Sequence, residues 1–304
     1  MDLNNPIFKD ETKAREHLEG LRWGEGRFCP HCGEAEKTSP VEGKSHRPGL
    51  YYCLSCKKTF TVTVGTLFER SKIPLTKWVL AFHLMNASKK GISAHQLHRM
   101  LGVTYKTAWF MAHRIREAMG GVNTEPMGGN GEVVEVDETF IGNKPGRKKG
   151  ARGTGHKHAV LSLVTRNGEA RSFHVGNVKA KTLMPILRKN VRKNTQVMTD
   201  EAKQYHHLDE TFADHQFVTH SAEEYVRDMV HTNTVEGFFS IFKRGMKGVY
   251  QHCGEQHLQR YLNEFDFRYS NRKITDAERA ALALAQIGGK RLTYRRTDKG
   301  QAIN

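Results

Sequence analysis

The sequence has no long apolar run, which excludes an integral membrane protein from the first hypotheses. No stretch of the 304 residues approaches the roughly 18 consecutive apolar residues that a membrane-spanning helix needs. The opening residues, MDLNNPIFKDETKAREH, are polar and charged, so we expect no signal peptide. We therefore expect a protein that works in the cytoplasm without a membrane partner.

Acidic residues are scarce relative to basic ones. The chain has 32 Asp and Glu against 48 Lys and Arg, which gives a formal net charge of +16. Such an excess favours an anionic partner, and nucleic acid is the commonest one. A basic protein of the ribosome or of a membrane surface is the alternative at this point.

Cysteines are also few, and their spacing is informative. Four of the five form two C-x-x-C pairs, Cys29 with Cys32 and Cys53 with Cys56, and Cys253 stands alone. Two such pairs predict a tetrahedral zinc ribbon rather than disulfides. Four thiolates leave no open coordination position, so we expect a structural ion that the ribbon needs for folding. For Cys253 we expect a structural role.

Helical periodicity predicts helices over residues 6–23 and 66–86, followed by a helix-turn-helix over 93–119. Ser93 is the expected cap, and Gly102-Val103-Thr104 is the expected turn. The outward face of the second helix is predicted to carry Tyr105, Lys106, Trp109, His113, Arg114 and Arg116. We expect Lys106, Arg114 and Arg116 to contact DNA, the alternative being a plain helical hairpin.

The Gly-rich linker that follows, 120–131, marks a domain boundary, after which strands and helices alternate. Strands are expected over 132–140, 195–199 and 214–220, with a hairpin over 158–176 around the Asn167-Gly168 turn. Helices are expected near 183–191, 231–250 and 255–269. This order predicts an α/β domain with a mixed sheet.

Three acids occupy suggestive positions in that order. Asp137 lies on the first strand of the domain, Asp200 ends the fourth, and Glu236 lies on a late helix. If they converge at one edge of the sheet, their mutual repulsion raises their pKa values unless cations neutralise them. Carboxylate oxygens favour Mg²⁺ or Mn²⁺, and two such ions can stabilise both the attacking and the leaving oxygen in phosphoryl transfer. Glu138 is expected to point away, because adjacent strand residues face opposite sides.

The helix over 231–250, HTNTVEGFFSIFKRGMKGVY, carries the third acid. Asn233, Glu236 and Lys243 recur at helical spacing on one face. Lys243 is a candidate phosphate-binding cation, and Asn233 is the alternative third ligand. We keep His231, which precedes the helix, as a candidate support for the site. An ordinary amphipathic helix is the alternative interpretation.

Residues 142–158 hold six Lys or Arg and no acid, directly after the strand of Asp137. We expect this Gly-rich stretch to follow a phosphate backbone, and a solvated loop is the alternative. The candidate DNA-binding residues here are Lys144, Arg147, Lys148, Lys149 and Arg152, joined by Lys243 and Arg244 on the later helix.

Five blocks of the sequence carry a family resemblance. They are LRWGEGRFCPHCG at 21–33, CLSCKKTFTVTVGTLFE at 53–69, VEVDETFIGNK at 134–144, VMTDEAKQY at 197–205 and HTNTVEGFFSIFKRGMKGVY at 231–250. With these blocks in this order, the chain resembles the ISXO-like insertion-sequence transposases, whose catalytic domain is ribonuclease-H-like.

This resemblance implies a DDE triad of Asp137, Asp200 and Glu236 that binds Mg²⁺ or Mn²⁺, with Lys243 as a further family feature. It implies cleavage at the terminal inverted repeats of an element and strand transfer into target DNA, by a homodimer or larger assembly on bacterial nucleoid DNA. Some relatives have Asn near the position of the third acid, which keeps Asn233 open.

The expected organisation is therefore a zinc ribbon (1–65), a helix-turn-helix region (66–120), a linker (121–131), a ribonuclease-H-like mixed-sheet catalytic domain (132–286) and a basic tail (287–304). A catalytically silent or domesticated DNA-binding protein is the alternative function. A nuclease of the same fold, such as a junction resolvase, is less consistent with two N-terminal DNA-reading modules.

Overall fold

The computed structural model of the chain describes residues 3–121, 125–129, 131–146, 148, 150–205, 208–218 and 230–293. It divides into two compact units, of which the first comprises Met1–Ala87, Ser93–Ala118 and Asp276–Asn304, and the second comprises Ser88–Ile92 and Met119–Thr275. None of the helices in the described part of the chain combines the length and the apolar character that a membrane crossing requires.

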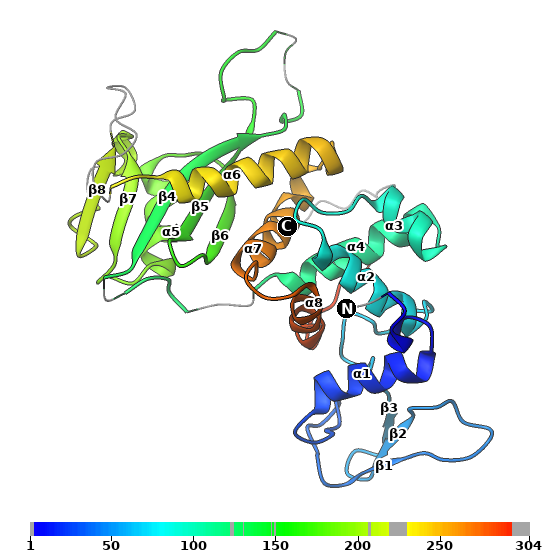
Figure 1. The fold of residues 1–304 in the computed structure, drawn as a ribbon. Coiled ribbons are helices and arrows are strands. Elements are labelled where there is room, and N and C mark those ends of the chain that lie inside the picture. Colours follow the sequence, from blue (N-terminus) through cyan, green and yellow to red (C-terminus); the bar gives the residue numbers. More distant parts are fainter. Residues whose placement is uncertain are drawn as a thin grey trace. The chain divides into compact units, whose positions relative to one another are not determined.

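The first unit combines a small sheet with helices (Figure 1). Its elements in chain order are η1 (Pro6–Phe8), α1 (Glu11–Trp23), β1 (Thr38–Pro40), β2 (Tyr51–Cys53), β3 (Lys58–Phe60), α2 (Leu75–Ala87), α3 (Ala94–Leu101), α4 (Tyr105–Met119) and α8 (Asp276–Ala285). Strands β1, β2 and β3 form an antiparallel sheet around the cysteine pairs. Asp10 interrupts the predicted helix over 6–23, because its carboxylate caps α1 by accepting from the N–H groups of Thr12 and Lys13.

The helix predicted over 66–86 begins only at Leu75, so that prediction is wrong in its first part. Pro74 lies directly before the helix, and a residue that precedes a proline avoids the helical conformation. Arg70 has a positive φ of 58°, which also excludes a continuous helix from Thr66.

The predicted pair of helices around a short turn is present as α3 and α4. The hydroxyl of Ser93 accepts from the N–H of Gln96 and caps α3. Gly102 ends α3 in the left-handed conformation, at φ 58°. Leu97 of α3 and Ile115 of α4 are both fully buried.

The second unit is an α/β domain built on a mixed five-stranded sheet with the order β6-β5-β4-β7-β8. The strands are β4 (Val133–Ile141), β5 (His158–Thr165), β6 (Ala170–Val175), β7 (Gln196–Asp200) and β8 (Asp214–Val218). β4 and β6 run antiparallel to β5, whereas β7 runs parallel to β4 and β8 parallel to β7. This mixed sheet confirms the predicted α/β fold class.

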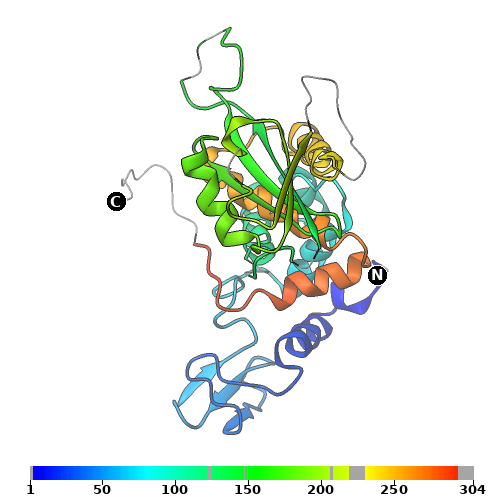
Figure 2. The ribbon, with the colours of Figure 1, turned by 90° about the vertical axis from the view of Figure 1, so that its left-hand side faces the viewer.

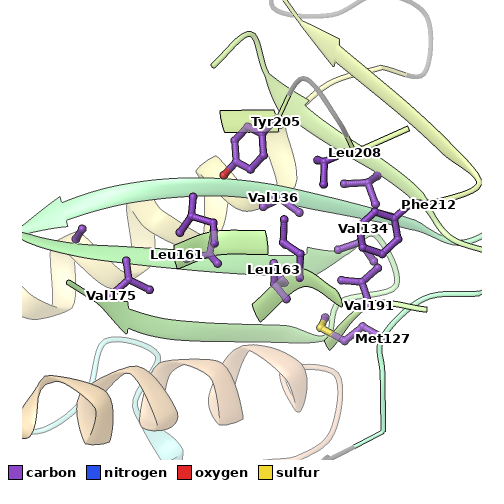
Figure 3. Packing of buried hydrophobic residues seen from close by; sticks show 14 residues of the cluster. Met127, Val134, Val136, Leu161, Leu163, Val175, Val191, Tyr205, Leu208 and Phe212 are labelled. Atoms are coloured by element: carbon purple, nitrogen blue, oxygen red, sulfur yellow. The ribbon is translucent and has the colours of Figure 1, made fainter. Parts of the chain in front are cut away.

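Helices cover both faces of this sheet (Figure 2). They are α5 (Ala180–Asn190), η2 (Lys203–Tyr205), α6 (Asn233–Gly245), the π-helix η4 (Met246–Tyr250), η5 (Glu255–His257) and α7 (Leu258–Ser270). Figure 3 shows the core on the α5 side, where Val134, Val136 and Leu161 of the sheet lie near Tyr205 and Leu208. On the other face, the phenylalanines of α6 and the apolar residues of α7 pack against β5 and β6.

Two differences from the predicted elements remain. The helix predicted over 231–250 is α-helical only to Gly245 and continues as one π turn, a form often found at functional sites. The helix α8 was not predicted. It packs within the first unit, where Arg279 donates to the carbonyl oxygen of Asn86 over 2.6 Å.

Candidate active site

Asp137 and Asp200 are brought together by the register of two parallel strands. Glu135 of β4 lies opposite Met198 of β7. Two residues further along each strand come Asp137 and Asp200. β4 is the central strand of the sheet, and Asp200 is the last residue of β7. Both carboxylates therefore lie toward the carboxyl ends of these parallel strands, where open α/β sheets commonly bind ligands.

The carboxyl group of Asp137 shows the electrostatic result of this convergence. Its pKa is raised to about 7, mainly by burial and also by the charges of Asp200, Glu138 and Glu236, whereas the hydrogen bond from the N–H of Glu138 lowers it. That N–H donates to Asp137 Oδ1 over 2.6 Å. The N–H of Ala202 donates to Asp200 Oδ1 over 3.1 Å and orients the second carboxylate. Three further acids thus act on one half-buried carboxyl group.

Glu236 approaches the pair from α6. It lies exposed in the first turn of the helix, and the hydroxyl of Thr232 donates to its Oε1 over 3.0 Å. Asn233, one turn earlier, is exposed as well. Lys243 lies seven residues after Glu236, with its Nζ 5.8 Å from the ring centre of Phe239.

Glu135, which the sequence analysis did not single out, fixes the start of α6. It is fully buried, and its carboxylate accepts from the N–H groups of Thr234 and Val235 over 2.7 and 3.0 Å. Arg166 Nε donates to it over 3.1 Å, and His231 Nδ1 lies 3.2 Å away. A side chain from β4 therefore caps the helix that carries Glu236.

The position of Glu135 in the sequence could have indicated its role. Glu135 lies two residues before Asp137 and therefore on the same face of the strand, where burying a carboxylate without a partner costs free energy. The same contact explains His231, which was kept as a supporting residue and which lies beside Glu135.

Glu138 faces the other side of β4, as alternation predicts, but it stays electrostatically close to the acids. Gln204 Nε2 donates to its carboxylate over 3.3 Å. Burial and the charge of Asp200 raise its pKa to about 7, whereas the hydroxyl of Tyr205 lowers it. In turn, burial and the charge of Glu138 raise the pKa of Tyr205 well above its usual value.

The four cysteines of the two C-x-x-C pairs form one cluster in the first unit. The Sγ atoms of Cys29 and Cys56 are 3.7 Å apart, as are those of Cys32 and Cys53. A zinc–sulfur bond of about 2.3 Å gives a tetrahedron with edges of about 3.8 Å. The cluster therefore has the geometry of a four-cysteine zinc site.

The helix-turn-helix candidates need a correction. Arg116 and His113 are buried, with 2% and 1% of their surface exposed, so neither lies on the outward face. Arg114 is half-buried and donates to the carbonyl oxygens of Leu67 and Leu292 over 2.7 and 3.2 Å. The outward face predicted from the periodicity of α4 is wrong for these residues, because the helix is covered on more than one side. Lys106 is exposed, as predicted.

The basic stretch forms the loop between β4 and β5 in the second unit (Figure 1). Lys148 and Arg152 are exposed in it and Lys144 is half-buried, whereas Arg147 and Lys149 lie outside the described residues. On α6, Arg244 is exposed and its Nε donates to the carbonyl oxygen of Ser240 over 3.1 Å.

Comparisons with known proteins agree with this arrangement. Residues 129–270 match the family described as the ISXO2-like transposase domain, and residues 9–59 match the transposase zinc-ribbon domain. The chain is 31% identical to an uncharacterized protein in transposable element ISH50 of Halobacterium salinarum, over 86% of this chain and 91% of that one. It is 29% identical to an uncharacterized transposase-like protein of Haemophilus influenzae, over 33% of this chain and 80% of that one.

Among solved structures, the chain is similar to the Mos1 strand transfer complex, at 12% identity and a TM-score of 0.29, over 72% of this chain and 79% of that one. It is also similar to a pre-cleavage Mos1 transpososome, at 13% identity and a TM-score of 0.26, over 67% and 75%.

Proposed function

The chain belongs to the ISXO2-like transposase family, and on this premise we propose that it is a DNA transposase that cuts DNA at the ends of an insertion sequence and joins the freed ends to target DNA. The observation that carries the proposal is the register of β4 and β7, which brings Asp137 near Asp200, while the charge of Glu236 on α6 also acts on Asp137.

We propose that Asp137, Asp200 and Glu236 hold Mg²⁺ or Mn²⁺. The residues suit such an ion by their charge: burial and the charges of Asp200, Glu138 and Glu236 raise the pKa of Asp137, and a divalent cation relieves this excess negative charge. Carboxylate oxygens are the ligands that these hard cations prefer. When bound, one or two ions stabilise the charge on the attacking and the leaving oxygen of the phosphoryl transfer.

The chain's own residues supply position and charge. Glu135 holds the first turn of α6 against β4, which keeps Glu236 within electrostatic reach of Asp137. Lys243 contacts a phosphate oxygen of the DNA. No protein side chain is the nucleophile: the attacking groups are water during cleavage and a DNA 3′-hydroxyl during strand transfer.

The other modules bind DNA in this proposal. The zinc ribbon and the pair α3 and α4 recognise the element ends, with Lys106 as the exposed basic candidate. The loop with Lys144, Lys148 and Arg152 follows the phosphate backbone beside the acids. Joining two ends requires a dimer or larger assembly, and the expected domain boundaries are part of the proposal.

A strand-transfer assay tests this function. Donor DNA that flanks the reading frame is incubated with target DNA and Mg²⁺ or Mn²⁺, with the wild type, Asp200→Ala, and Glu210→Gln as a control at an exposed acid. We expect joined products from the wild type and the control only.

Full activity of Asp200→Ala contradicts the acid site. Specific binding to the ends without any cleavage under both metals favours the DNA-binding protein without catalysis.

A further inference from the structure

Two histidines and a glutamate of the second unit converge away from the three acids. His158 is the first residue of β5, His174 lies on β6, and Glu255 begins η5. His174 pairs with Val160 across the two strands, so His158 is its diagonal neighbour on the same face of the sheet. The two imidazole rings meet edge to face, with their centres 5.4 Å apart.

The polar atoms of the three side chains lie around one point. His158 Nδ1 is 3.8 Å and His174 Nε2 is 3.9 Å from the same oxygen of Glu255. One ligand atom from each residue lies within 4.8 Å of the others. These distances exceed those of hydrogen bonds, so the groups converge without bonding to one another.

His158 gives an independent indication of a missing partner. Its side chain is only 5% exposed, and its Nδ1 has no hydrogen-bond partner within the described ranges. Buried ring nitrogens normally have a partner. This nitrogen faces Glu255 and His174, and an ion between the three residues would satisfy it.

The spacing suits a tetrahedral zinc ion after a small adjustment. Bonds of about 2.0–2.2 Å to nitrogen and oxygen give edges of about 3.4 Å between ligand atoms. The distances from the two ring nitrogens to the Glu255 oxygen are 3.8 and 3.9 Å. They shorten to about this value if Glu255 moves by about half an ångström toward the histidines. Glu255 is 51% exposed and has the freedom to do so.

We propose that His158, His174 and Glu255 form a further metal site, which binds Zn²⁺ or a similar divalent transition ion. Imidazole ligands favour such ions over Mg²⁺. The three residues leave one coordination position for water or a fourth ligand. The site shares no ligand with the four cysteines or with Asp137, Asp200 and Glu236.

The position of this site suggests what the ion does. His158 pairs with Ile141 of β4, so the ion lies where the basic loop over 142–157 returns to the sheet. Glu255 belongs to the segment after α6 and η4. The ion therefore links the end of the basic loop, the edge strand β6 and the segment that begins at Glu255.

Metal content tests the proposal on the full-length protein, independently of transposition. Zinc per chain is measured by mass spectrometry of the elements in the wild type, His174→Ala, Glu255→Gln and Cys53→Ser. We expect about two ions in the wild type and about one in each variant. Glu255 is exposed, so its conservative variant remains informative if His174→Ala fails to fold.

The matched control is His252→Asn, which changes an exposed histidine three residues before Glu255. It keeps the full zinc content. About one ion in the wild type, unchanged content in both cluster variants, or an equal loss in the control would overturn the assignment.

Cobalt substitution separates the two sites by their ligands. Thiolate ligands give Co²⁺ a strong charge-transfer absorption that nitrogen and oxygen ligands lack. We expect Glu255→Gln to lose one cobalt ion per chain with this absorption unchanged. Loss of the charge-transfer band instead would show that the variant disturbs the cysteine site and would overturn the proposal.

Discussion

At Glu135 a single buried carboxylate connects the central strand to the helix of the candidate site. It accepts two backbone hydrogen bonds at the start of α6 and pairs with Arg166. Because the carboxylate is fully buried, its removal leaves a cation and two N–H groups without this acceptor.

We therefore expect Glu135→Ala to lower the free energy of unfolding by roughly 3 kcal/mol. Urea denaturation followed by circular dichroism measures this change. Glu210→Ala, at an exposed acid, is the control and should shift stability by less than about 0.5 kcal/mol. Equal effects of the two substitutions would contradict the capping role of Glu135.

The raised pKa of Asp137 predicts a pH-dependent response to magnesium. Its pKa rises to about 7 in the folded chain from an ordinary value of 3.8, so the folded state binds the proton more tightly than the unfolded state. Without divalent ions, this group favours folding less as the pH rises from about 4 to about 7. A cation reverses this trend because it binds the ionised form.

We expect the increase in melting temperature on adding Mg²⁺ to be larger at pH 8 than at pH 6. Differential scanning fluorimetry measures it, and Asp137→Asn should remove most of the increase. A magnesium response that is independent of pH, or that persists in the variant, would contradict a site at Asp137.

At the scale of elements, α6 presents two candidate ligands one turn apart. Both Asn233 and Glu236 are exposed, but only a carboxylate neutralises a cation, and the charge of Glu236 acts on Asp137. We expect Glu236→Gln to reduce strand transfer by about 100-fold or more, and Asn233→Ala to reduce it by less than about 10-fold. The yield of joined DNA measures both effects. A larger loss in Asn233→Ala than in Glu236→Gln would identify Asn233 as the third ligand.

The sheet of β1, β2 and β3 is too small to be stable through burial alone. Each strand has three residues, and of these nine only Tyr51, Cys53 and Phe60 are buried. We expect Cys53→Ser to lose one zinc ion and to expose residues 25–60 to protease, whereas Cys253→Ser should behave as the wild type. Unchanged zinc content in Cys53→Ser would contradict the four-cysteine site.

At the scale of the whole molecule, the net charge of +16 predicts DNA binding that weakens steeply with salt. Changing Lys144, Lys148 and Arg152 together to Glu should reduce the slope of log affinity against log salt by about three. The control changes Lys179, Lys181 and Lys189, exposed at and near α5, to Glu. Binding titrations at several salt concentrations give the slopes, and equal losses in both triple variants would exclude a specific role for the loop.

The sequence by itself determined the features that depend on local spacing. Two C-x-x-C pairs predicted one cysteine cluster because a single tetrahedral ion needs four thiolates close together. Alternating and helical periodicities predicted the strands of the second unit and α6, since each element buries one face. The order of Asp137, Asp200 and Glu236 along these elements predicted where the acids lie, and their role as metal ligands stays a prediction.

Only the tertiary structure decided what depends on contacts between distant segments. The burial of Arg116 follows from neighbours that periodicity cannot reveal. Glu135 meets the start of α6 across about 100 residues of chain, and His158 meets Glu255 across a similar distance. Such pairings arise when strands and helices pack, so a carboxylate or an imidazole acquires its partner, and with it its chemistry, only in the folded chain.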